Sequence, residues 1–184
     1  MRWSIPIVLL LLWPLSCLAR QAADTSRVDF DALAGLSAQR VQLADAVAAS
    51  KRASGKPVED TARESEQLSS LAVRAGQLGI DPEAARDFFR AQIEANKLVQ
   101  YRLLLDGDTR GATEADDLGK IRKELDALNA GMLRLLPQAL PMSRGAQCRT
   151  RLADAIGRTT ALRHLDALHA TALVRSFGDF CRNR

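Results

Sequence analysis

The sequence has few of the side chains on which many kinds of functional site depend. Its 184 residues include three cysteines, two histidines and one tyrosine, and aromatic residues make up only 4%. So few aromatics leave no platform on which bases could stack, which weighs against binding to single-stranded nucleic acid. No serine or cysteine stands beside a histidine, and neither a catalytic acid pair nor a metal-ligand cluster is present, so nucleophilic catalysis and a metal centre are not indicated. His164 and His169, five residues apart, are interpreted as ordinary helix residues.

Long apolar runs are also absent except near the start of the chain. Arg2 precedes the run IPIVLLLLWPL at residues 5–15, and small residues follow in SCLA and RQAA. This order predicts a secretory signal peptide over residues 1–19, with cleavage possible as late as residue 23, because the run is too short for a comfortable membrane span. We therefore expect a periplasmic or secreted protein with no membrane contact after cleavage.

Two alternatives to a cleaved signal peptide remain open at this point. The segment could stay as a membrane anchor, or Cys17 could accept a lipid, although Pro14 stands where such motifs usually carry leucine. The formal net charge of the whole chain is +4, and residues 1–19 contribute only Arg2 to it. A mildly basic chain, whose two tryptophans both lie in this leader, gives no argument for a nucleic-acid partner.

The rest of the chain has the composition of packed helices. Hydrophobic residues make up 47%, leucine and alanine abound, and neither strand-like alternation nor an internal repeat is present. We predict an all-α fold, a single bundle of about six helices over residues 28–184, with a main bundle over 28–140 and a C-terminal helix pair over 146–184. The helices are expected at about residues 30–54, 60–79, 81–105, 114–136, 147–157 and 160–181.

Capping residues and helix breakers set these limits. SGKP at residues 54–57 ends the first helix, and Asp60 or Thr61 caps the second. Asp81 caps the third helix, whose first turn contains a proline. PQALPMSRG at residues 137–145 has two prolines and predicts a linker between the fourth helix and the tail.

Two cysteines remain after removal of the signal peptide, Cys148 and Cys181, and export would place them in an oxidising compartment. An even pair in an oxidising compartment is most simply a disulfide, because the spacing is not Cys-x-x-Cys and a metal site would need more ligands. Closing this loop would stabilise the fold by roughly 3–4 kcal/mol in the chain-entropy model. We expect the bond to tie the C-terminal helix pair to the rest of the domain.

Four of the predicted helices carry polar side chains on the stripe that should face the core. Steps of three and four residues place on these stripes Arg40, Lys51, Arg63, Gln67, Asn96, Gln100 and Arg122. Three explanations are open: long stems lying on apolar surface with solvated ends, internal ion pairs with Asp45, Glu64 or Glu66, or a pocket for an anion. Four cations share the stripes without an acidic residue, and arginine suits carboxylates, so the pattern favours a pocket for an anion with more than one negative group.

Several of these residues also stand in a recognisable order. Arg40 lies early in a long helix, Lys51 follows eleven residues later, PVEDTAR comes at residues 57–63 and QIEANKLVQY at residues 92–101. This order resembles the all-helical chorismate mutases of the secreted AroQ-class subgroup. The segment IRKELDALN at residues 121–129 resembles the part that supplies another substrate-binding arginine. The signal peptide and the late cysteine pair are also similar to that subgroup.

The resemblance implies an isomerase that converts chorismate to prephenate by a Claisen rearrangement without a cofactor. It assigns Arg40, Arg63 and Arg122 to the two carboxylates of the substrate. It assigns Lys51 and Gln100 to the ether oxygen of the breaking C–O bond, where negative charge develops in the transition state. Some relatives carry glutamate at the position of Gln100.

The remaining assignments are less direct. The resemblance places Glu64 or Gln67 at the ring hydroxyl, with the backbone near Asp60 assisting, and Asn96 stands where relatives often carry threonine or serine. It also implies a homodimer with one site in each subunit, completed by Arg122 of the same chain. The alternatives are a non-catalytic periplasmic helical module that binds an acidic ligand or a partner helix, and a mutase-derived fold that has lost catalysis.

Overall fold

Helices form all of the regular secondary structure in the computed structural model, which describes residues 30–107 and 118–181. In chain order they are residues 30–42, α2 (Ala44–Ser54), α3 (Thr61–Gln77), α4 (Pro82–Leu105), α5 (Leu118–Ser143), α6 (Cys148–Leu162) and α7 (Ala167–Arg175). The predicted all-α fold is confirmed for this part of the chain. The predicted signal peptide and the predicted start of the fourth helix near residue 114 lie outside the described residues.

The first predicted helix, residues 30–54, continues through a single turn residue. The backbone N–H of Leu43 donates to Gln39 at 3.0 Å, and that of Val47 donates to Leu43 at 3.1 Å, so helical hydrogen bonds bridge the turn. The helix ends at Gly55, which has a φ of 65°. Glycine adopts this left-handed conformation without a Cβ clash, and the chain can therefore turn sharply towards α3.

The starts of α3 and α4 are where their capping residues predict them. The side chain of Asp60 accepts a hydrogen bond from the backbone of Arg63 at 3.2 Å. The side chain of Asp81 accepts one from Glu83 at 3.0 Å, and Pro82 occupies the first turn of α4. Both caps satisfy backbone donors that have no partner within the helix.

The predicted linker at residues 137–145 is wrong, because α5 runs on to Ser143 with Pro137 and Pro141 inside it. Leu136 and Ala139 are completely buried in these last turns. Each proline removes one backbone hydrogen bond and strains the helix, but continued burial of the apolar face offsets that loss.

The predicted limits of the last two helices are also wrong. The buried stripe of α6, formed by Leu152, Ala155 and Thr159, continues past the glycine at which we expected a break. The chain turns instead at residues 163–166, where His164 has a φ of 49°, so His164 is not a helix residue. Asp166 then caps α7 by accepting a hydrogen bond from the backbone of His169 at 2.9 Å.

His169 has a structural role that the sequence does not predict. Its ring Nε2 lies 2.9 Å from a carboxylate oxygen of Asp45 on α2, and its Nδ1 lies 2.7 Å from Asp166. The hydrogen bond to Asp45 raises the pKa of His169 to about 9; burial opposes the shift and Asp166 adds to it. The imidazolium therefore links α7 to the helix that carries Lys51.

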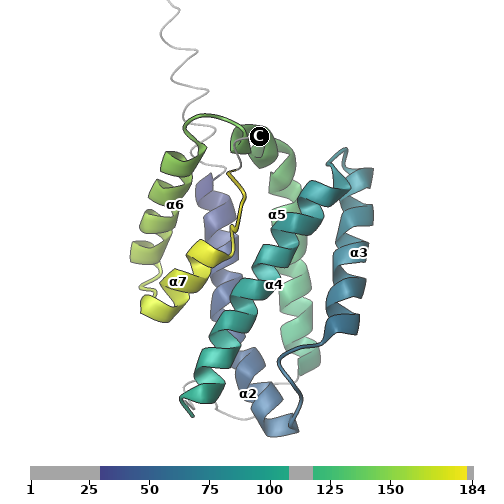
Figure 1. Ribbon diagram of the computed structural model, residues 1–184, viewed down its shortest axis with the longest axis vertical. Coiled ribbons are helices and arrows are strands. Elements are labelled where there is room, and N and C mark those ends of the chain that lie inside the picture. Colours follow the sequence, from purple (N-terminus) through teal and green to yellow (C-terminus); the bar gives the residue numbers. More distant parts are fainter. Residues whose placement is uncertain (1–29, 108–117, 182–184) are drawn as a thin grey trace, which may run out of the picture.

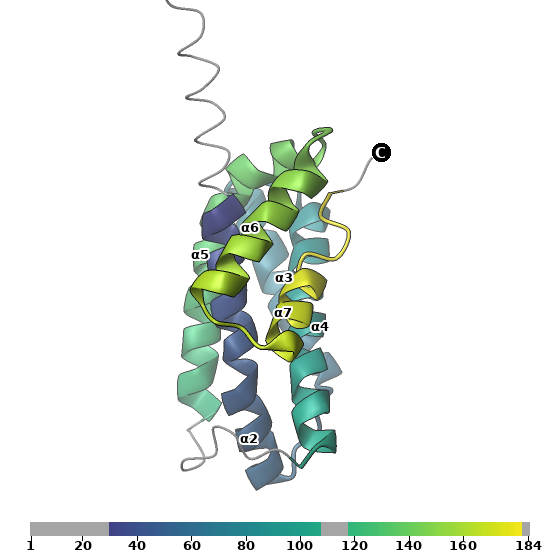
Figure 2. The same cartoon turned by 90° about the vertical axis from the view of Figure 1, so that its left-hand side faces the viewer.

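α4 lies in the middle of the bundle and contacts α2, α3, α5 and α7 (Figure 1). Figures 1 and 2 show α6 and α7 on the half of the bundle that lies away from the α2–α3 loop. There Phe88 of α4 packs edge-on against Phe177 and Phe180, and the predicted disulfide between Cys148 and Cys181 is confirmed, with Cα atoms 5.7 Å apart. Among the described helices, none is both long enough and apolar enough to cross a bilayer. This packing leaves the other half of the bundle for the polar side chains.

Candidate active site

A cavity of about 90 Å³ lies in this other half, between the helix of residues 30–42 and α2, α3, α4 and α5. All nine residues that the sequence predicts for a binding site line it: Arg40, Lys51, Asp60, Arg63, Glu64, Gln67, Asn96, Gln100 and Arg122. The remaining lining residues are Val47, Val58, Ile93, Lys97 and Leu125. Five separate helical segments thus bring the predicted side chains to one place.

Arg40 is the most deeply placed of the cations, with an exposed fraction of 4%. Its Nε donates to the side-chain oxygen of Asn129 on α5 at 3.2 Å, and one terminal nitrogen donates to the backbone carbonyl of Gln92 on α4 at 2.8 Å. Burial lowers the pKa of Arg40 to about 10, with Asp126 opposing the shift. The guanidinium therefore stays charged at neutral pH, and two neighbouring helices hold it in one orientation.

Asn96 and Gln100 form a row of amides along α4 beside Arg40. The Asn96 amide nitrogen donates to the backbone carbonyl of Arg40 at 2.9 Å, and the Gln100 amide nitrogen donates to the Asn96 side-chain oxygen at 2.7 Å. The side-chain oxygen of Gln100 is buried without a hydrogen-bond partner. Because an amide nitrogen carries two hydrogens, Gln100 keeps one donor beyond its bond to Asn96.

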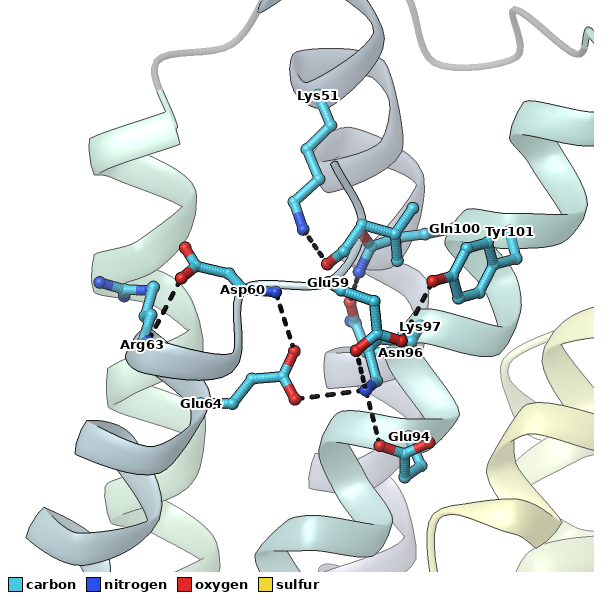
Figure 3. A network of polar contacts seen from close by, with 11 residues as sticks. Lys51, Glu59, Asp60, Arg63, Glu64, Glu94, Asn96, Lys97, Gln100 and Tyr101 are labelled. Carbon is cyan, nitrogen blue, oxygen red and sulfur yellow. Dashed lines mark hydrogen bonds and ion pairs between the residues drawn. The ribbon is translucent and has the colours of Figure 1, made fainter. Parts of the chain in front are cut away.

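Lys51 lies on α2, and its ammonium group donates to the backbone carbonyl of Val58 (Figure 3). Burial lowers the pKa of Lys51; the charges of Asp60 and Glu64 oppose this shift, and the charge of Arg122 adds to it. Arg122 lowers the pKa of Lys51 because the two cations, which come from different helices, lie close enough to repel each other. An anion bound between them would relieve their repulsion.

The first turn of α3 supplies three further groups to the cavity. Asp60 caps the helix, Arg63 is half-buried, and one carboxylate oxygen of Glu64 accepts a hydrogen bond from the backbone of Asp60 at 3.3 Å. This reciprocal arrangement resembles a capping box, with the returning carboxylate one residue later than in the standard motif, and it fixes the backbone from which Arg63 and Glu64 project.

The charges of the cavity favour an anion. Five cationic side chains line it against two carboxylates. Of the acidic residues considered as ion-pair partners for the cations, Asp45 pairs with His169 and Glu64 pairs with Lys97 instead. The deep burial of Arg40 also argues against solvated ends as the general explanation. An anion with two negative groups would compensate this excess of positive charge.

The cavity is smaller than the roughly 300–1,000 Å³ that is usual for ligand sites. Several of the side chains that line it are only half-buried, including Lys51, Arg63 and Arg122. We therefore expect Lys51 to leave the carbonyl of Val58 when a ligand enters, because the ammonium group then gains a charged acceptor in place of a neutral one.

Three contributors to the site are missed by the sequence patterns. Lys97 lies three residues after Glu94, a spacing typical of an exposed helical ion pair, and nothing in the sequence shows that Glu59 and Glu64 approach it as well. Asn129 stands on the predicted inward stripe of α5, which could have marked it as a partner for Arg40. The contact of Gln92 uses its backbone carbonyl, which no side-chain pattern reports.

No metal site accompanies these residues within the described parts of the chain, where no three His, Cys, Asp or Glu side chains gather as ligands. The groups on hand are hydrogen-bond donors, cations and two carboxylates. Such a set can bind, orient and stabilise developing charge.

Comparisons with known proteins point to one family. A family model described as chorismate mutase type II matches residues 24–101. The secreted chorismate mutase of Mycobacterium tuberculosis is 31% identical over 182 residues, covering 97% of this chain and 90% of that protein. The secreted chorismate mutase of Mycolicibacterium smegmatis is 31% identical over 153 residues, or 82% of this chain and 84% of that protein. The crystal structure of a chorismate mutase from Burkholderia phymatum superposes with a TM-score of 0.79 at 36% identity, covering 85% of this chain and 98% of that one.

Proposed function

The chain belongs to the chorismate mutase type II family, and we propose that its cationic cavity is the site at which it converts chorismate to prephenate. The observation that carries this assignment is the convergence of Arg40, Lys51, Arg63 and Arg122 on one cavity from four different helical segments. Chorismate has two carboxylates, a ring hydroxyl and an ether oxygen. Each has a complementary group among the lining residues.

The arginines bind and orient the substrate. Arg40, Arg63 and Arg122 hold the two carboxylates, so that the flexible enolpyruvyl side chain is kept over the ring. The reaction breaks one C–O bond and forms one C–C bond within a single molecule, and no proton needs to be transferred. Binding the substrate in its reactive conformation therefore lowers the activation barrier directly, because the entropy lost in reaching that conformation is compensated by the binding interactions.

Lys51 and Gln100 act on the atom where charge accumulates. C–O cleavage runs ahead of C–C formation, so the ether oxygen becomes more negative in the transition state. An ammonium group and an amide N–H directed at that oxygen bind the transition state more strongly than the substrate, which is the requirement for catalysis. Gln100 provides this hydrogen at every ordinary pH.

The ring hydroxyl is bound at the α3 side of the cavity. Glu64 accepts its hydrogen, with Gln67 as the neighbouring alternative and the backbone at Asp60 assisting. Asn96 contributes mainly by fixing Gln100, through the 2.7 Å hydrogen bond between their side chains.

The proposal extends to the processing and assembly of the chain. Two of its relatives are named secreted chorismate mutases, which supports export after removal of residues 1–19 or 1–23. The mature domain then covers residues 28–184, with a main bundle that continues to the end of α5 at Ser143, beyond the predicted limit of 140, and the C-terminal pair over 146–184. We also propose a homodimer with an active site inside each chain, which light scattering of the purified mature chain would test.

The direct test is conversion of chorismate by the purified mature chain. Loss of chorismate absorbance and formation of prephenate are followed together, without added metal or cofactor. Lys51→Met is expected to lower kcat by about 10²–10³, the size of effect seen when a donor to a developing oxyanion is removed. Lys56→Met is the matched control, because Lys56 is exposed in the loop that follows the same helix.

Two outcomes would contradict the proposal. A folded sample that leaves chorismate unchanged would favour a non-catalytic module that binds an acidic ligand. Equal activity of Lys51→Met and Lys56→Met would mean that rearrangement does not take place in this cavity.

A further inference from the structure

Lys97 of α4 is a buried cation that the proposed reaction does not use. It lines the cavity with an exposed fraction of 8%. Its ammonium group lies 2.8 Å from a carboxylate oxygen of Glu94, 3.2 Å from one of Glu59 and 3.2 Å from one of Glu64 (Figure 3). Three carboxylates from α4, the α2–α3 loop and α3 thus share a single cation.

This cluster keeps Lys97 charged. Burial alone would lower the pKa of Lys97, but the hydrogen bonds that its ammonium group donates to Glu94, Glu59 and Glu64 outweigh this effect and raise the pKa. Glu59 is further held by the hydroxyl of Tyr101, which donates to its second oxygen at 3.0 Å. Glu59 and Glu94 are about half and two-fifths exposed, whereas the side chain of Glu64 is only 21% exposed. Because Glu64 is the least exposed of the three carboxylates, water can least replace its ion pair with Lys97.

Glu64 lies between two sets of cations. One of its oxygens accepts from the backbone of Asp60 and the other from Lys97, while its charge also acts on Lys51 across the cavity. Without Lys97, the released oxygen of Glu64 would be available to pair with Lys51, on which its charge already acts, or with Arg63, which lines the same cavity. A carboxylate tethered in the same cavity competes intramolecularly, so its effective concentration does not depend on how much substrate is present.

We propose that Lys97 is a positioning residue, which holds Glu64 against α4 so that this carboxylate does not bind Lys51 and Arg63 in place of the substrate. The inference rests on the proposed function, because it takes a dianionic substrate as the ligand of those cations. It also explains how a cavity can contain a carboxylate next to cations that have to stay available. In the same position Glu64 keeps acceptor capacity for a ring hydroxyl.

The test combines kinetics with binding of an oxabicyclic dicarboxylate that mimics the transition state. Lys97→Met removes the charge and keeps the length of the side chain. We expect it to raise both KM for chorismate and the calorimetric Kd for the analogue about tenfold, which is the effect of one pKa unit of lost charge pairing. We expect kcat to change by less than about threefold, because competition by Glu64 ends once substrate is bound.

The decisive variant is the double substitution Lys97→Met/Glu64→Gln. A neutral glutamine cannot compete for Lys51 and Arg63, so adding the second substitution should recover most of the lost affinity. If Lys97 had only a structural role, the double variant would bind the substrate and the analogue as weakly as the single variant does, or more weakly. Arg90→Met is the matched control, since Arg90 is also on α4 and pairs with an acidic residue three positions before it, but its side chain is 52% exposed. Its KM and Kd should equal those of the unmodified chain.

Failure of this inference is distinguishable from failure of the proposed function. Turnover by the unmodified chain, with no change in KM and Kd in Lys97→Met or no recovery in the double variant, overturns the role of Lys97 alone. Absence of turnover together with the expected pattern in Kd would refute the enzymatic activity and leave the role of Lys97 standing. An unmodified chain that binds no analogue refutes both. Lys97→Gln replaces Lys97→Met if the latter does not fold, with the same expected results.

Discussion

Replacing His169 by glutamine should destabilise the fold at neutral pH and leave its stability almost unchanged at high pH. His169 is 9% exposed, and its ring joins Asp45 of α2 to Asp166 at the start of α7. The two hydrogen bonds to carboxylates raise its pKa from 6.5 to about 9 in the folded chain. A raised pKa means that folding favours the protonated ring, so the stabilisation is complete below pH 6.5 and is lost as the pH rises through 9.

The size of the effect follows from this difference in pKa. Each unit corresponds to about 1.4 kcal/mol, which sets an upper bound of about 3.5 kcal/mol on the contribution of the charged ring. The side chains of Asp45 and Asp166 are 35% and 50% exposed, so water screens part of the attraction. We therefore expect His169→Gln to lower the free energy of unfolding by about 2 kcal/mol at pH 6.

Urea unfolding followed by circular dichroism, with the disulfide intact, measures this difference between pH 6 and pH 10.5. Other titrating groups act equally on both proteins and cancel in the comparison. His164→Asn is the matched control, because His164 is the only other histidine, is exposed, and has a positive φ that asparagine tolerates. A difference between the unmodified chain and His169→Gln that stays constant over this range would refute the reasoning.

Three further predictions concern the site and the disulfide. Gln100→Glu should give an activity that falls as pH rises, because glutamate donates a hydrogen only when protonated, while the unmodified chain stays active; a flat profile for the variant in steady-state assays would count against the role of Gln100. Asn129→Leu removes the side-chain acceptor of Arg40 Nε and should lower kcat/KM at least about tenfold, since hydrogen bonds to charged groups contribute about 1.5–3 kcal/mol; unchanged kinetics would show that Arg40 needs no support from α5. Cys148→Ser/Cys181→Ser opens a loop with a sequence separation of 33 and should lower the free energy of unfolding by about 3–4 kcal/mol in urea titrations; a loss below about 1 kcal/mol would mean that core packing already holds α6 and the C-terminal segment in place.

Local signals predicted the helix limits wherever they agreed with burial. Asp60 and Asp81 cap helices in the structure as they do in the sequence pattern, and Gly55 ends a helix with a positive φ. Pro137 and Gly157 predicted breaks that do not occur, because apolar stripes continue through both positions. A propensity of a few kcal/mol is overridden when it conflicts with several buried side chains.

The candidate site was predictable because its residues are polar and occupy helix positions that are predicted to face the core. Arg40 and Gln100 are both at most 4% exposed, and side chains of this kind are rarely buried without a partner. Lys97 was not predictable, because its partners Glu59 and Glu64 are 38 and 33 residues away and meet it only in the folded chain. The same limit applies to His169, whose partner Asp45 is 124 residues distant.

The central claim, that cations from several helices form one site for a dicarboxylate, is tested most directly by a crystal structure with the oxabicyclic transition-state analogue. We predict the analogue inside the cavity, with its carboxylates within about 3 Å of guanidinium nitrogens of Arg40, Arg63 or Arg122 and its ether oxygen within that distance of Lys51 and Gln100. Lys51 should have left the carbonyl of Val58. An analogue bound elsewhere, or a complex in which Arg63 and Arg122 point into solvent, would contradict the account.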